Sequence, residues 1–319
     1  RVLFRSKKMN KLKTLGLTAL GTALISTSAF AADMSVTGGA SISFDDTNRG
    51  KANRGNGMYM GDSINFNASG EMDNGWGVAV HYEIDGGALD DHSITLTLGE
   101  MGSINFNGSG GVLAMGAVDD VMPNAYEESW DVVAGADANV INGVSGAGSL
   151  KYTSPTVSGA SISVGYLNSG SALAVSYSDF AISLAPEAVE GLTLGYAAGD
   201  SEEVSGTTQD DSTMYIKYVY GPVTVGYQVS ERDINAASSD LESDSMGITY
   251  AVSDNISVGY HATSITKDTD SDSQESTGLS ASYTMGSMTL AGAMNSVDNV
   301  AFAASDDLEG YEFTLSFAF

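Results

Sequence analysis

The sequence contains no cysteine, only four prolines and few basic residues. Without cysteine the chain forms neither disulfides nor thiolate metal sites, which is compatible with an oxidising compartment but does not require one. After residue 31 no apolar run approaches the roughly 20 residues that a membrane-spanning helix needs. These absences exclude a disulfide-stapled protein and a helical membrane protein.

The scarcity of basic residues restricts the possible partners. From Ala32 onward the chain carries seven Lys and Arg against 40 Asp and Glu, a net charge of −33. Because contacts with nucleic-acid phosphates need Lys and Arg, no nucleic acid is expected as a partner. The charge favours cations and keeps the protein away from other anionic surfaces.

The first 31 residues read as a secretory signal. Met9 and a basic segment precede the apolar run 15–25 and a small-residue cleavage site at Ala29-Phe30-Ala31. This run is too short for a membrane span. We therefore expect residues 1–31 to be upstream residues (1–8) and a cleaved signal peptide, and residues 32–319 to form a single domain.

Glycine and tyrosine are abundant, and apolar and polar residues alternate along much of the chain. The alternation is without fault over residues 311–319, where the chain ends on Phe319. A period of two indicates a strand with one apolar and one polar face. An exported chain that ends on such a strand indicates a β-barrel of a bacterial outer membrane, with Phe319 as a C-terminal assembly signal. A secreted β-solenoid, a soluble β-sandwich and a disordered acidic chain are the alternatives, and the regular alternation argues against disorder.

Sixteen strand segments are predicted, separated by turn signals. They lie near residues 34–45, 58–70, 76–85, 92–99, 103–108, 149–156, 160–168, 172–185, 192–200, 212–220, 223–232, 245–252, 256–266, 277–285, 288–296 and 310–319. Short turns and longer acidic connections alternate, which places all the short turns on one rim, the periplasmic one. In the segment 172–185 the apolar residues change parity, and we interpret Ser178-Asp179 as a bulge.

A repeated Ser/Thr-Val/Leu-Gly-Tyr motif occurs in four of the segments. Its tyrosines share the apolar face and are predicted to form an aromatic girdle at the membrane interface: Tyr166, Tyr196, Tyr227 and Tyr260. The opposite face carries short polar residues such as Asn65, Asn67, Asn105 and Asn107. A barrel of sixteen strands is wide enough for such residues to line an aqueous channel.

One connection, residues 108–148, is far longer than the others, and structureless stretches of that length usually have a function. It follows the fifth segment on the outer side and leads into Leu150-Lys151-Tyr152-Thr153-Ser154-Pro155. With the signal peptide, the sixteen segments and the terminal Phe319, this chain resembles the general porins of Gram-negative bacteria, in particular those of the alphaproteobacterial type. The resemblance covers the whole mature chain, and its fairly specific motif is the Tyr-Thr-Ser-Pro segment.

The resemblance implies an all-β, transmembrane, antiparallel 16-stranded barrel in the bacterial outer membrane. It also implies a homotrimer in which the long third outer loop folds into each pore. Acidic residues of that loop would then face basic residues on the pore wall. The acidic candidates are Asp119, Asp120, Glu127, Glu128, Asp131 and Asp137.

The basic residues of the pore wall depart from the family pattern. Porins of this type usually carry an arginine cluster on the early strands, whereas the second to fifth segments here contain no Lys or Arg. The candidates are Arg49, Lys51 and Arg54 in the first outer loop and, by inward parity, Lys151, Lys217 and Arg232. A charge facing lipid near mid-bilayer costs about 2–4 kcal/mol, so the inward placement is favoured. We hypothesise that these cations face the acidic loop and that the net field still favours cations.

The expected function is passive diffusion of small hydrophilic solutes and ions through a water-filled pore in contact with outer-membrane lipid. The alternative is a structural or adhesive barrel with a closed lumen. Catalysis is not expected: His81 and His261 point inward, but no serine is placed beside them to act as a nucleophile. No cofactor or dedicated metal site is expected, although the acidic loops, such as residues 268–272, are compatible with weak calcium binding.

Overall fold

A computed structural model describes residues 33–49, 57–136, 146–168, 176–202, 208–235 and 240–319. The proposed signal peptide, Lys51, Arg54 and Asp137 lie outside these ranges, and so do the side chain of Arg49 and the start of the segment predicted at 172–185. Three short 3-10 helices occur in the described chain, Gly99–Met101, Met115–Ala117 and Val300–Phe302. None of the described helices is long and apolar enough to cross a membrane.

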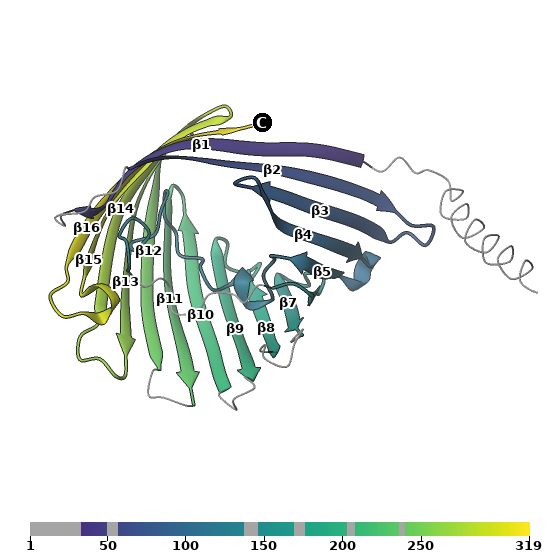
Figure 1. Cartoon of the computed structure of the whole chain (residues 1–319). Helices are drawn as coiled ribbons and strands as arrows, with labels where there is room; N and C mark the ends of the chain where they lie inside the picture. The colour runs from purple at the N-terminus through teal and green to yellow at the C-terminus, as the bar shows by residue number, and fades with distance from the viewer. Residues whose placement is uncertain (1–32, 50–56, 137–145, 169–175, 203–207, 236–239) are drawn as a thin grey trace, which may run out of the picture.

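Sixteen antiparallel strands form one closed barrel in which each strand pairs with its neighbours in sequence (Figure 1). They are β1 (Asp33–Arg49), β2 (Met58–Glu71), β3 (Gly77–Asp85), β4 (Ala88–Thr97), β5 (Ser103–Ser109), β6 (Ser149–Thr153), β7 (Ala160–Leu167), β8 (Ser176–Leu184), β9 (Leu192–Glu202), β10 (Thr208–Tyr220), β11 (Val223–Ile234), β12 (Leu241–Ser253), β13 (Ile256–Lys267), β14 (Gln274–Met285), β15 (Met288–Asp298) and β16 (Leu308–Ala318). The predicted fold class and strand number are confirmed.

The barrel closes where the first strand meets the last. β1 pairs with β16 from Gly39 opposite Ala318 to Arg49 opposite Glu309. At the periplasmic end Gly38 and Phe319 exchange two backbone hydrogen bonds, of 2.8 and 2.9 Å. Closure leaves no sheet edge, so every strand finds backbone partners on both sides, as lipid requires.

The two faces of the wall differ as the alternation predicts. Large apolar residues such as Met214, Met246 and Leu279 are about half exposed on the outer face, at 54%, 48% and 63%. Towards the outer rim the same face becomes acidic, for example at Asp210 on β10 and Asp244 on β12. The change from apolar to acidic residues marks the upper edge of the lipid-facing band.

The outer connections are shorter than the sequence indicates. β3 and β4 are joined by the two-residue turn Gly86-Gly87, with φ of 55° and 80°, and β4 begins at residue 88 rather than 92. The acidic ends of β10, β12 and β14 are likewise strand rather than loop. Beyond the lipid an outward side chain can carry charge without cost, so strand pairing continues through residues that composition alone assigns to loops.

The predicted bulge at Ser178-Asp179 is wrong. β8 keeps an unbroken register with both β7 and β9. Tyr177 points inward, is 3% exposed, and its hydroxyl lies 3.6 Å from Met115 Sδ in the long loop. At Tyr177 the apparent change of parity arises because an inward position is apolar and contacts the loop, not because the described backbone is irregular.

Closure at Gly38 gives a testable prediction. A Cβ added there would lie 2.6 Å from the Ser63 carbonyl oxygen and 2.9 Å from the Phe319 ring. We expect Gly38→Val to lower the free energy of unfolding by about 1–3 kcal/mol, because overpacking forces the strands apart. The measurement is the midpoint of urea unfolding of the refolded barrel, followed by heat-modifiable gel mobility.

Gly70→Val is the matched control, since a Cβ at Gly70 in β2 would meet nothing within 4 Å. Equal midpoints for the two variants would contradict the role assigned to Gly38.

Candidate functional site

The described part of the chain between β5 and β6, residues 110–136, enters the barrel and follows its inner wall (Figure 1). The first anchor is the Asp179 carboxylate of β8, which is 6% exposed and accepts hydrogen bonds from the backbone N–H groups of Ala114 (3.1 Å) and Met115 (2.7 Å). Lys151 Nζ of β6 donates to the Val112 carbonyl oxygen at 3.0 Å. A charged acceptor for two buried N–H groups fixes the start of the loop.

Apolar packing and one glutamine hold the next segment. Met115, Val118 and Met122 pack with Ala181, Ala197 and Tyr215 of β8, β9 and β10 in one buried cluster. Gln228 of β11 donates to the carbonyl oxygens of Val118 (2.9 Å) and Asp119 (2.8 Å). The loop therefore buries an apolar face against the wall, although the wall lines an aqueous channel.

The second half of the loop is held mainly by polar contacts from β13 to β16. Ser280 Oγ accepts from Ala125 N–H at 3.1 Å, and Asn295 Nδ2 donates to Glu128 O at 2.6 Å. Tyr126 donates its hydroxyl to Glu312 of β16. Val133 then packs against Val297, Val300 and Leu308. The loop is thus attached along the inner wall from β7 to β16.

His261 and Ser129 form a contact that the sequence did not reveal. His261 Nδ1 accepts the Ser129 N–H at 3.2 Å and lies 3.0 Å from Ser129 Oγ. Ser129 is fully buried, and His261 Nε2 has no hydrogen-bond partner among the described residues. A serine does stand beside this histidine, contrary to expectation, but its burial denies access to a solute, and the pair positions the loop.

The predicted acidic residues of the loop fall into two groups. Glu127, Glu128 and Asp131 place carboxylate oxygens within 4.8 Å of one another, and Asp119 and Asp120 lie earlier along the loop. Asp131 and Asp120 are exposed, and because the loop lies inside the barrel they are accessible from the lumen.

Burial and the closeness of other carboxylates raise the pKa of several of these residues. Burial and the neighbouring Asp131 raise the pKa of both Glu127 and Glu128 above the usual range of a glutamate. Asp120 is exposed at the loop surface, but the surrounding loop and wall remove part of its solvent; this desolvation, with the negative charges of Asp119 and Asp131, raises its pKa to about 6. The loop therefore gains negative charge progressively through neutral pH.

The wall that the loop leaves uncovered is neutral or acidic. On β2 to β5 the inward side chains bond one another, as in His81 Nδ1 to Asn67 Oδ1 (2.8 Å) and Asn105 Nδ2 to Thr95 Oγ1 (2.8 Å). Glu83 accepts from Asn65 at 3.4 Å. These four strands contain no Lys or Arg.

The predicted basic residues of the strands do point inward, but their contacts differ from the hypothesis. Arg232 pairs with Asp211 of the adjacent strand through Nε at 2.8 Å. Lys217 Nζ lies 6.0 Å from the centroid of the Tyr215 ring, and Lys151 bonds the loop backbone. None of these three contacts is with a loop carboxylate.

The predicted girdle tyrosines face outward, with Tyr166, Tyr196 and Tyr227 40–49% exposed and Tyr260 half-buried. The strand register relates the heights of these tyrosines. Across β10, Tyr196 of β9 lies level with Val229 of β11, because both pair with Met214, and Val229 is two residues beyond Tyr227. The same offset separates Tyr227 from Tyr260. Because barrel strands are tilted, this stepwise offset runs along one level of the barrel. Tyr227 also donates its hydroxyl to Asp244 at the acidic edge.

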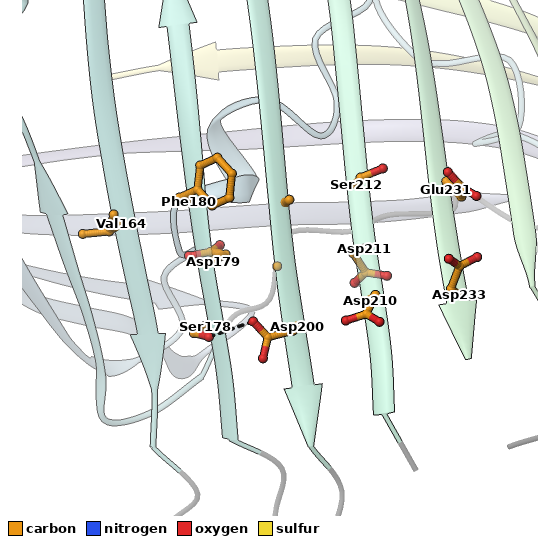
Figure 2. A pocket seen from close by; sticks show the side chains of 12 residues that line it. Val164, Ser178, Asp179, Phe180, Asp200, Asp210, Asp211, Ser212, Glu231 and Asp233 are labelled. Atoms are coloured by element: carbon orange, nitrogen blue, oxygen red, sulfur yellow. Dashed lines mark hydrogen bonds between the residues drawn. The ribbon is translucent and has the colours of Figure 1, made fainter. Parts of the chain in front are cut away.

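A pocket of about 500 Å³ lies towards the outer ends of β7 to β11. Figure 2 shows the carboxylates of Asp200, Asp210, Glu231 and Asp233 on neighbouring strands, with Ser178 bonded to Asp200 at 3.1 Å. Strand parity places these four carboxylates on the outer face of the barrel, away from the lumen. The pocket therefore belongs to the acidic rim and not to the channel.

Sequence reasoning missed the wall residues that hold the loop, in particular Asp179, Gln228, Ser280, Asn295 and Glu312. Their inward parity could be read from the alternation, but nothing in the sequence shows which inward residues the loop will cover.

Residues 16–275 match the Gram-negative porin family. No curated protein sequence gives a significant match. Among solved structures the chain is similar to OmpF of Salmonella typhi in complex with daunomycin (13% identity, 90% of this chain and 98% of that chain, TM-score 0.70). It is also similar to an anion-selective porin from Comamonas acidovorans (13%, 90% and 100%, 0.68) and to the trimer form of OmpT of Vibrio cholerae (11%, 91% and 100%, 0.67).

The closed sixteen-stranded barrel with a long loop inside it defines an outer-membrane channel for small solutes. The chain belongs to the Gram-negative porin family, as the match over most of its length shows. Its location is accordingly the bacterial outer membrane.

Proposed function

We propose that this porin is a passive, cation-preferring diffusion channel for small hydrophilic solutes and ions. The observation that carries the proposal is the asymmetry of the lumen. The loop presents Glu127, Glu128, Asp131 and Asp120, while the facing strands β2 to β5 carry no basic residue. Fixed negative charge at a narrowing concentrates cations there and repels anions. This function needs no cofactor and no catalytic residue.

The alternative is a structural or adhesive barrel with a closed lumen. The loop follows the wall from β7 to β16 rather than crossing the lumen as a plug, which favours the channel. Weak calcium binding by the acidic loops stays a prediction.

We further propose that the protein assembles as a homotrimer surrounded by outer-membrane lipid. The trimer form of the similar Vibrio cholerae OmpT supports this assembly. The exposed apolar band on the outer face supports lipid as the other partner. We expect native mass spectrometry of the detergent-solubilised protein to give three times the mass of the mature chain, and a monomer mass would contradict the proposal.

Ion selectivity tests the proposed function directly. In a planar bilayer under a potassium chloride gradient, we expect stepwise conductance with a reversal potential of the cation-selective sign. At a pH above the raised pKa values of both residues, Glu127→Gln with Glu128→Gln should reduce the cation-to-anion permeability ratio by roughly two-fold or more, because it removes charge at the narrowing.

Asp200→Asn with Asp210→Asn is the matched control, since it removes two carboxylates from the outer face and should leave the ratio unchanged. A folded barrel without conductance would favour the structural alternative. Anion selectivity would show that basic residues such as Arg49, Lys51 and Arg54 dominate the opening.

The pH dependence of selectivity follows from the raised pKa values. Protonation neutralises the loop carboxylates, so cation preference should fall as the pH is lowered from about 8 to about 5, through the pKa of Asp120 near 6. The measurement is the reversal potential at each pH in the same bilayer.

The triple variant Asp120→Asn, Glu127→Gln, Glu128→Gln should show a reversal potential that hardly changes with pH. A profile that stays as steep in this triple variant would place the titrating groups elsewhere.

A further inference from the structure

The inner wall carries glycines where the third loop touches it. A Cβ added to Gly310 would lie 1.7 Å from the Val132 carbonyl oxygen, and one added to Gly247 would lie 2.3 Å from the Pro123 carbonyl oxygen. At Gly259 the distance to the Ala125 nitrogen would be 2.7 Å. Normal carbon contacts are about 3.5 Å, so the loop backbone occupies the space that side chains would take.

These glycines are not required by backbone conformation. None of Gly226, Gly247, Gly259, Gly278 and Gly310 has a positive φ. They lie inside regular strands, where glycine is unfavourable because it adds no packing and costs entropy. Close approach of the loop is therefore the physical reason for glycine at these positions.

Four of these glycines are followed, two positions later, by a residue that forms a hydrogen bond with the loop. The glycine and that residue share the same inward face. The triplets are Gly226-Tyr227-Gln228, Gly259-Tyr260-His261, Gly278-Leu279-Ser280 and Gly310-Tyr311-Glu312. Gln228 donates to Val118 O and Asp119 O, and His261, Ser280 and Glu312 accept from Ser129, Ala125 and Tyr126. Residues i and i+2 of a strand share a face, so each triplet offers a gap for the loop and a polar group beside it.

We propose that this Gly-x-polar triplet is the device that sets the position of the third loop and thereby the cross-section of the pore. The glycine determines how far the loop stands from the wall, and the polar residue fixes its height and register. The inference rests on the proposed channel function and assigns its size-determining residues to the wall as well as to the loop.

This arrangement also explains the glycine of the repeated Ser/Thr-Val/Leu-Gly-Tyr motif. In Gly-Tyr-Gln and Gly-Tyr-His the tyrosine faces outward, while the glycine and the polar residue face the loop. In Gly195-Tyr196-Ala197 of β9 a Cβ on the glycine would meet the Tyr215 ring instead of the loop, and Ala197 packs in the apolar cluster with Met115. The loop therefore lies against the glycine in the complete triplets, whereas at Gly195 a wall side chain fills the space.

Alanine substitutions test the proposal, with single-channel conductance of the wild type and each variant as the measurement. Because the barrel wall is fully paired, we expect the loop to move into the lumen and the conductance to fall. The fall should be largest for Gly310→Ala, smaller for Gly247→Ala and smallest for Gly259→Ala, the order of the three distances. For Gly310→Ala we expect a loss of roughly a quarter or more, since conduction follows the width of the narrowing.

Gly77→Ala is the matched control on the uncovered wall. A Cβ at Gly77 in β3 would lie 3.4 Å from Thr97 Cβ, an ordinary contact, so the conductance should not change. Heat-modifiable gel mobility selects folded barrels for every comparison. If Gly310→Ala fails to fold, the difference between Gly259→Ala and Gly77→Ala decides, because Gly259 belongs to a triplet.

Equal conductance in the folded glycine variants and the wild type would overturn the inference while leaving the channel intact. A wild type without conductance would instead refute the proposed function. Gln228→Leu tests the polar half of the triplet: it removes the donor to two loop carbonyls, and we expect greater fluctuation of the open-channel current in barrels that gel mobility shows to be folded. Current noise identical to that of the wild type would refute this half.

Discussion

The structure depends on the requirement that every backbone polar group within lipid be hydrogen-bonded. Sixteen strands meet it by closing on themselves, and the mutual bonds between Gly38 and Phe319 complete the ring at its periplasmic end. Once the wall is closed, each strand has one face towards lipid and one towards the lumen. The side-chain alternation, the position of the loop and the aqueous interior all follow from this closure.

The wall and the loop depend on each other. A barrel of this width is not filled by its own short inward side chains. The loop covers the inner wall from β7 to β16 and provides the buried apolar cluster around Met115 and Val118. In return the wall supplies Asp179 and Gln228 as partners for loop backbone groups. On the uncovered strands β2 to β5 several inward polar side chains bond one another, as His81 does with Asn67.

The charged residues lie in different environments on the outer face, on the loop and on the strands. The carboxylates on the outer face, such as Asp210 and Asp244, extend strands beyond the lipid and stand apart from the lumen. Those of the loop lie inside, where burial and mutual repulsion raise the pKa of Asp120, Glu127 and Glu128. Basic residues on the strands are engaged locally, as Arg232 is by Asp211. Carboxylates thus lie at the outer rim, on the loop and on the inner wall, where Asp179, Asp211 and Glu312 each hold a local partner.

The sequence by itself determined the barrel, its sixteen strands, the inward or outward direction of most side chains and the existence of a long third loop. Alternation with a period of two and turn residues are local signals, so they can be read without the fold. Only the tertiary structure decided that Tyr177 faces the loop without a bulge, that Arg232 pairs with Asp211, and that His261 meets Ser129. Those contacts join residues distant in the chain through the path of one loop, and no local pattern encodes that path.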